Sequence, residues 1–264
     1  MICHIKVYIL IFFSFICTVN AQQIARENTL FTAGHASAFI GGLYDAFYTY
    51  KDLKLKGDFG LGAPDQLDGE ILILKGKIYQ TQSSGKTFEV DPNGSTPFSV
   101  VNFFKTDRVL KVTKTLHKNQ LYAYLDSVLT NKNAIYAIHI YGEFDLIRTR
   151  AFPKVTQKPY TPLAEMLSLQ HFFNFERING DLVGYYIPAF MEGENISGYH
   201  FHFLSVDKQH GGHIIELLTN RITIEIDQLS NFNVALPQTT AFKNFDFKKD
   251  RTEEVKKVEN GKAN

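Results

Sequence analysis

The later part of the chain is patterned as β-strands, and this pattern constrains the fold more than any other feature. Along residues 222–227, isoleucines alternate with Thr, Glu and Asp, so an extended segment there has one apolar and one polar face. Three further β-prone runs precede it, at 182–187, 198–205 and 213–218. The region from Gly180 onward is therefore predicted to be mostly sheet.

The earlier part mixes both kinds of element. Strands are expected at 71–74, 78–81, 98–104, 134–141 and 142–150. Helices are expected at 29–50, at 110–129 (where Leu121, Leu125 and Leu129 recur at helical spacing), and briefly before His171. The glycine-rich stretch 56–62 predicts a loop, and the charged residues 248–257 predict a solvated terminal helix.

Together these elements predict an α/β fold of the α+β type, built from two sheet-dominated halves. We place the division near the proline-rich stretch at Lys158, which gives an N-terminal α/β half at 22–157 and a C-terminal β-rich half at 158–264. The chain has 264 residues, of which 44% are hydrophobic, so it is long enough to bury a core of this kind.

Residues 1–21 are expected to be a signal peptide. Lys6 precedes an apolar run at 7–19 that is too short to cross a bilayer comfortably, and cleavage is expected just before Gln22. An uncleaved membrane anchor is the alternative. Both cysteines, Cys3 and Cys17, lie in this segment, so the exported chain would contain neither a disulfide nor a thiolate nucleophile. The exported protein is expected either in the periplasm or in the external medium.

A histidine constellation in the β-rich region predicts a metal site. On a strand, His200 and His202 project from the same face. Residues 207–212 are rich in turn formers, so the next strand should return antiparallel and place His213 opposite His202. Cross-strand Cβ atoms are about 5 Å apart, which lets imidazoles share one ion. Three histidines with one open coordination position are typical of catalytic zinc.

Other histidines are not expected to join this metal site. His210 falls in the turn and is predicted to face solvent. The remaining ones are assigned structural or surface roles: His35, His117, His139 and His171. A His-x-His strand with a third histidine nearby also occurs in α-type carbonic anhydrases and in cupins. Cupins normally add a Glu shortly after the second His, where this chain has Val206-Asp207.

Several blocks along the chain resemble the α-acetolactate decarboxylases. The first is the histidine segment itself, His-Phe-His-Phe-Leu-Ser-x-Asp at 200–207 followed by Gly-Gly-His at 211–213. The other blocks follow the order of that family: 57–62 (Gly-Asp-Phe-Gly-Leu-Gly), 67–70 (Leu-Asp-Gly-Glu), 96–98, Arg150, 158–160 and 257–259. The resemblance covers nearly the whole chain after the signal peptide.

The resemblance implies which residues form the site. It assigns a Zn2+ cofactor to His200, His202 and His213. It assigns catalytic roles to Glu70, Arg150 and Glu259, with Arg148 as the alternative arginine. It also implies a two-domain α/β fold, usually a homodimer, that acts on the small molecule 2-acetolactate. One departure is Ala63, which stands where many members carry Thr, so that a hydroxyl contact is lost.

The implied chemistry suits these residues. Loss of carbon dioxide from 2-acetolactate leaves an enediolate, and a metal that chelates the ketone and hydroxyl oxygens would accept its negative charge. Arg150 can stabilise the carboxylate or the developing oxyanion. A buried glutamate with a raised pKa, either Glu70 or Glu259, can deliver the proton that sets the chirality of acetoin.

Two other functions remain compatible with the histidines. An exported zinc hydratase or hydrolase of carbonic-anhydrase type would need no role for Glu70 or Arg150. A non-catalytic module would use the metal only to stabilise its sheet. Nucleic acid and acidic membranes are excluded as partners by charge, because a formal net charge of +1 gives no electrostatic footprint for them.

Overall fold

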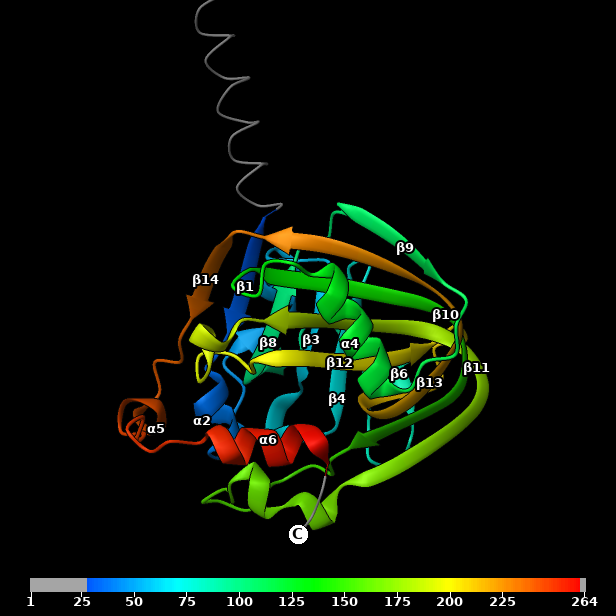
Figure 1. Cartoon of the computed structure of the whole chain (residues 1–264). Coiled ribbons are helices and arrows are strands. Elements are labelled where there is room, and N and C mark those ends of the chain that lie inside the picture. The colour runs from blue at the N-terminus through cyan, green and yellow to red at the C-terminus, as the bar shows by residue number, and fades with distance from the viewer. Residues whose placement is uncertain (1–27, 262–264) are drawn as a thin grey trace, which may run out of the picture.

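The structure, a computed structural model, describes residues 28–261, which form two β-sheets packed face to face with short helices around them (Figure 1). The first sheet has seven strands in the order β14 (Asn231–Ala235), β1 (Thr29–Ala33), β8 (Phe98–Asn102), β3 (Phe59–Ala63), β4 (Glu70–Leu74), β5 (Lys77–Thr81) and β6 (Thr87–Glu89). Neighbours are antiparallel except β1 and β14, which are parallel. The predicted signal peptide lies outside the described residues.

The second sheet consists of β10 (Ile135–Ala151), β11 (His171–Ile187), β12 (Gly198–Ser205), β13 (Gly211–Leu229) and β9 (Arg108–Val112). The long strand β10 pairs with β11 on one side and with β13 on the other. Its pairing with β13 shifts register at three places, which are typical points for a strand to bend. Figure 1 shows β10, β11 and β13 curving round the right-hand side. The turn at 206–210 folds the first residues of β13 back beside the end of β12.

The remaining elements are short. β2 (Tyr48–Thr49) and β7 (Ser95–Thr96) form a small separate sheet. The helices are α2 (Ala36–Ile40), α3 (Tyr50–Lys54), α4 (Lys118–Val128), α5 (Thr240–Lys243) and α6 (Thr252–Asn260). Four 3-10 turns join them: η1 (Asp65–Leu67), η2 (Leu163–Glu165), η3 (Leu167–Leu169) and η4 (Ala189–Met191). Among residues 28–261, no helix combines the length and the apolar character needed to cross a membrane.

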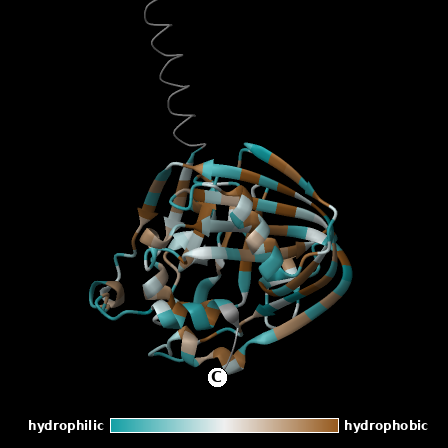
Figure 2. Ribbon diagram, in the orientation of Figure 1, coloured by the Kyte–Doolittle hydropathy of each residue, from teal (hydrophilic) through white to brown (hydrophobic). Residues whose placement is uncertain are grey.

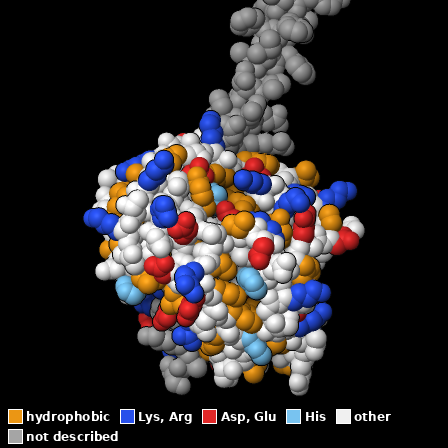
Figure 3. All heavy atoms as spheres, turned by 90° about the vertical axis from the view of Figure 1, so that its right-hand side faces the viewer, with side chains coloured by type: hydrophobic (Ala, Val, Ile, Leu, Met, Phe, Trp, Pro, Cys, Tyr) orange, Lys and Arg blue, Asp and Glu red, His pale blue; other side chains and the backbone are white. Residues whose placement is uncertain are grey.

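Apolar side chains gather on both faces of the second sheet. One core lies between the two sheets, where Leu61 and Val100 of the first sheet meet Val183 and Leu204 of the second. Another lies under α4 on the opposite face of the second sheet. Hydrophobic and hydrophilic residues alternate along many strands (Figure 2), whereas β4 and β8 are buried along their whole length. The outer face shown in Figure 3 intersperses basic and acidic side chains, in keeping with the small net charge.

The predicted α+β class and most predicted strands are confirmed. β12 has the expected bounds, and the strands expected at 71–74 and 78–81 are β4 and β5. The runs at 134–141 and 142–150 are one strand, β10, and those at 213–218 and 222–227 are one strand, β13. The leucine stripe is also present, since Leu121, Leu125 and Leu129 are all buried. The helix expected at 110–129 is shorter than predicted: α4 begins only at Lys118, and residues 110–112 belong to the strand β9.

Two local predictions were wrong. In place of the helix expected at 29–50, the structure has β1, α2, β2 and the start of α3. β1 is an inner strand that pairs with β14 and β8. Its residues do not alternate between apolar and polar, so no strand period marks them in the sequence. The loop expected at 56–62 contains most of β3. Its glycines let β3 approach β8 closely: a Cβ at Gly60 would lie 2.1 Å from the Val100 carbonyl oxygen, and one at Gly62 2.5 Å from that of Phe98.

The terminal helix is also less solvated than its charge suggested. α6 begins at Thr252, and Val255 and Val258 bury its apolar face in the core between the sheets. The division proposed near Lys158 does not coincide with the sheets. β10 precedes that residue but belongs to the second sheet, and β14 follows it but pairs with β1 in the first.

A buried polar network ties the two sheets together away from the histidines. Asn102 at the end of β8 donates to Asp227 on β13 at 2.9 Å and accepts from the Tyr185 hydroxyl of β11 at 2.8 Å. Asp227 is 1% exposed, and its Oδ1 has no hydrogen-bond partner among the described residues. Burial raises the pKa of Asp227 to about 7, although the Lys105 backbone N–H and Asn102 favour the ionised form.

The raised pKa of Asp227 predicts a pH-dependent cost to stability. Between about pH 4 and pH 7 the unfolded chain ionises this carboxyl and the folded chain does not, so its effect on stability becomes less favourable as pH rises and levels off above 7. Asp227→Asn should therefore raise Tm relative to the wild type more at pH 8 than at pH 5, measured by thermal unfolding. Asp91→Asn, in an exposed turn, is the control. Equal differences in Tm at both pH values would contradict the prediction.

Candidate active site

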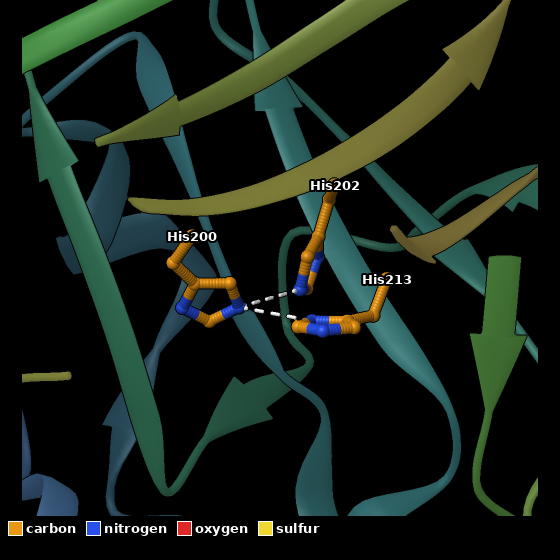
Figure 4. Close-up of side chains that lie close together, drawn as sticks. All are labelled: His200, His202 and His213. Carbon is orange, nitrogen blue, oxygen red and sulfur yellow. Dashed lines mark hydrogen bonds between the residues drawn. The ribbon is translucent and has the colours of Figure 1, made fainter. Parts of the chain in front are cut away.

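Three histidines converge where the β12–β13 hairpin closes (Figure 4). His200 and His202 leave β12 on the same face, and His213 of β13 pairs directly with His202. His200 Nε2 lies 3.3 Å from His202 Nε2 and 3.1 Å from His213 Nδ1. The hairpin register predicted from the turn residues is therefore the one observed.

The donor set fits a tetrahedral metal ion. The three ligand atoms all lie within 4.8 Å of one another. Zinc bonds of about 2.0–2.1 Å to nitrogen, at tetrahedral angles, separate neighbouring ligands by about 3.3 Å. The two separations measured from His200 are close to this value. His202 Nδ1 donates to the Ile71 carbonyl oxygen at 2.8 Å, which fixes the tautomer and leaves the Nε2 lone pair free to bind an ion.

Burial keeps the imidazoles in the form that binds metal. It lowers the pKa of His200 to about 3, and it lowers the pKa values of His202 and His213 well below their usual 6.5. The positive charge of nearby Arg150 acts in the same direction on all three. The cluster is therefore neutral at pH 7, and neutral imidazole is a good ligand for divalent ions.

Two carboxyl groups and one guanidinium surround the histidines. Glu70, at the start of β4, places Oε2 3.5 Å from His202 Nε2. Glu259, on the last turn of α6, places Oε2 3.8 Å from His213 Nε2 and 3.9 Å from His200 Nε2. Arg150, on β10, donates from Nη1 to Glu70 Oε1 at 2.5 Å and is 3% exposed. Residues from four distant segments thus meet around one point.

Both carboxyl groups are suited to hold a proton near neutral pH. Burial raises the pKa of Glu70 to about 7 even though the adjacent Arg150 favours its ionised form. Burial also raises the pKa of Glu259 to about 7, again opposed by the charge of Arg150. Groups that titrate near pH 7 in a buried site are good candidates for proton transfer.

Apolar side chains make up much of the wall around the site. Its free volume is about 20 Å³, about the space of one water molecule. The wall comes mainly from apolar side chains: Phe39, Phe98, Phe152, Leu163, Ile196 and Val258. Charged and hydrogen-bonding groups therefore face one another with little water between them, which strengthens their electrostatic interactions.

Outside this pocket lie three other residues considered from the sequence: Arg148, His210 and His139. Arg148 is partly exposed, with its guanidinium 4.8 Å from the centre of the Phe172 ring and 4.0 Å from Glu216. His210 is half-buried rather than exposed, with its ring against Phe175. His139 is buried between two carboxylates, Asp181 at 2.9 Å and Glu225 at 3.1 Å.

Parts of the pocket had no signal in the sequence. Phe39 on α2 and Leu163 on η2 are ordinary apolar residues, and such residues are too common to mark a site. The Ile71 carbonyl that orients His202 is a backbone group and carries no residue signature. Glu259 stood in a charged tail, where only the family resemblance singled it out.

Comparisons with known proteins agree with this geometry. A family model described as alpha-acetolactate decarboxylase matches residues 30–249, a range that contains the three histidines, Glu70 and Arg150. An alpha-acetolactate decarboxylase of Brevibacillus brevis is 36% identical over 239 residues, which cover 90% of this chain and 84% of that protein. One from Methanosarcina mazei is 34% identical over 233 residues, covering 88% and 81%. The crystal structure of alpha-acetolactate decarboxylase from Bacillus subtilis superposes with a TM-score of 0.84 at 30% identity, covering 88% of this chain and 99% of that chain.

Proposed function

The chain belongs to the alpha-acetolactate decarboxylase family, a family of carboxy-lyases, and we propose that it converts 2-acetolactate to acetoin and carbon dioxide at a zinc ion. One observation carries the finer part of this proposal. Three neutral imidazoles, two carboxyl groups with raised pKa values and one buried guanidinium converge in a nearly dry pocket.

His200, His202 and His213 would hold the ion. The distances among their nitrogens and the fixed tautomer of His202 support a three-histidine site that would leave the ion accessible to substrate oxygens. When bound, zinc supplies a positive centre that chelates oxygens of the substrate and accepts negative charge as carbon dioxide leaves. Other first-row divalent ions suit the same ligands, so the choice of zinc over those ions belongs to the proposal.

Arg150 would bind the substrate carboxylate and orient it. Its Nη1 is engaged by Glu70, but its Nε is buried without a hydrogen-bond partner among the described residues. A buried donor without a partner is costly unless a ligand satisfies it. A carboxylate bound there would share the pocket that the histidines line, and loss of its carbon dioxide would leave an enediolate in that pocket.

We assign proton delivery to Glu259. Glu70 accepts a short hydrogen bond from Arg150. Within residues 28–261, Glu259 makes no such bond with Arg150, and it approaches His200 and His213 from a different element, the helix α6. A group with a pKa of about 7 holds a proton in a large fraction of molecules at neutral pH. Because it comes from a fixed direction, that proton would reach one face of the enediolate and yield one enantiomer of acetoin in excess.

A hydratase of carbonic-anhydrase type fits these residues less well. It would require no second carboxyl group and no buried arginine beside the ion, yet Glu70 and Arg150 line the same pocket as the histidines.

We further propose that the protein is exported and acts as a homodimer. The apolar run at 7–19 supports export, and the usual state of the family supports the dimer.

The proposal is tested by an acetoin assay on purified protein. We expect acetoin from racemic 2-acetolactate, a loss of at least about a hundredfold in rate after chelation, and recovery when zinc is restored. Retention of the fold after chelation should be checked by circular dichroism. If the zinc-loaded, folded protein forms no acetoin, the proposed reaction is wrong for this chain. If chelation has no effect on the rate, the metal part fails alone.

A further inference from the structure

The catalytic assignment of Glu259 depends on how α6 is held, because this helix has only nine residues. The chain reaches it through a long surface segment that follows β14 and includes the short helix α5 (Figure 1). α6 packs against η2 and α2. Such a short helix is not stable alone, so its position is set by its tertiary contacts.

The first turn of α6 is anchored by Arg251. This residue is 9% exposed, and its guanidinium carbon lies 4.4 Å from the centre of the Phe245 ring. Its Nη1 donates to the carbonyl oxygens of Asp246 and Lys249 at 2.8 and 3.2 Å. Val255 and Val258 then bury the apolar face of the helix. These contacts fix the N-terminal end and the side that faces the core.

The C-terminal end, next to Glu259, is held by Gln170. Its Nε2 donates to the Gly261 carbonyl oxygen at 2.9 Å. Gly261 adopts the left-handed conformation that ends a helix, with φ 63°. A Cβ there would lie 2.6 Å from Ile215 Cδ1, so a side chain at this position would require Ile215 to shift. Gln170 is 8% exposed, and it stands directly between η3 and β11, where its backbone is fixed.

We propose that Gln170 is a positioning residue that holds the last turn of α6 and thereby sets the direction from which Glu259 approaches the substrate. The inference rests on the proposed function, because it needs a proton delivered to one face of an enediolate. Val258 and Glu259 of α6 line the pocket, so the hydrogen bond to Gly261 fixes one part of the pocket wall.

Gln170 can be replaced without a large effect on folding. Its Oε1 is buried and has no hydrogen-bond partner among the described residues, so an apolar side chain of similar length removes an unsatisfied acceptor. The Gly261 carbonyl, in a partly exposed residue, can then bind water. Gln170→Met keeps the length of the side chain and loses the amide. Gln170→Asn keeps the amide but shortens the arm.

The test compares the enantiomeric excess of acetoin, kcat and KM for the zinc-loaded wild type and both variants. We expect both substitutions to lower the enantiomeric excess and to reduce kcat by about tenfold, because a small misplacement of a reacting group is costly. KM should change by less than about threefold, because Arg150 and the histidines are untouched. Zinc content should equal that of the wild type.

The control is Ile138→Val, which trims a side chain in the core under α4, away from α6. It should lower Tm and leave the enantiomeric excess unchanged. The inference is overturned if both Gln170 variants keep the wild-type enantiomeric excess and kcat, or if they only lower Tm as the control does. A wild type that makes no acetoin would instead overturn the proposed function, and the two failures are thus distinguishable.

Discussion

Replacing His202 with alanine is expected to lower kcat/KM for acetoin formation by about a thousandfold or more. The substitution removes one of three ligands, and the ion would supply at least about 4 kcal/mol of charge stabilisation in the transition state. His202 is also the histidine whose tautomer is fixed by the Ile71 carbonyl, which keeps its Nε2 available as a ligand. The measurement is steady-state kinetics together with the zinc content of the purified protein.

His210→Ala is the matched control, because His210 lies in the turn of the same hairpin. Its backbone bonds with Ser205 survive the substitution, and only a ring contact with Phe175 is lost. We expect unchanged zinc content and activity within about twofold. Should His202→Ala keep zinc and full activity, the three-histidine site is not the catalytic centre. If it unfolds at 25 °C, and the wild type also unfolds when its zinc is removed, the metal acts as a structural staple, as the non-catalytic alternative predicts.

The hairpin that carries the histidines was predictable because its information is local. Strand alternation places His200 and His202 together, and the run of turn residues sets the register of His213. Residue type then limits the chemistry, since three imidazoles suit few ions besides zinc and its neighbours. The strands β4, β5 and β12 were predictable for the same reason.

The assembly around the histidines was not predictable from local pattern. The pairing of β10 with β13 shifts register at three places that no residue type predicts, and in the resulting register Arg150 lies opposite His213. β3 was predicted to be a loop because it is rich in glycine, but these glycines allow close packing against β8. The segment of α6 was predicted to be solvated because seven of its nine residues are polar. Its two valines, Val255 and Val258, are buried only because the helix packs on the core. In each case the deciding contact is far away in the sequence.

Replacing Arg150 with methionine is expected to lower kcat/KM by about a hundredfold to a thousandfold. Removal of one preorganised donor of this kind commonly costs that much, and methionine retains most of the buried volume. The substitution also leaves Glu70 buried without its partner. The loss of a charge partner in a buried pair costs up to about 3–5 kcal/mol of stability, and less where the carboxyl can take up a proton, as a pKa of about 7 allows. Tm should therefore fall, and more at pH 8 than at pH 6.

A double variant separates these two effects. Glu70→Gln combined with Arg150→Met leaves no buried charge at this pair, so Tm should recover toward that of the wild type while activity stays low. Arg148→Met is the matched control on the same strand, since Arg148 is partly exposed and outside the pocket, and it should keep activity within about twofold. Recovery of activity along with Tm in the double variant would mean that Arg150 serves only to neutralise Glu70. A large loss of activity in Arg148→Met would mean that the wrong arginine has been assigned to the substrate carboxylate.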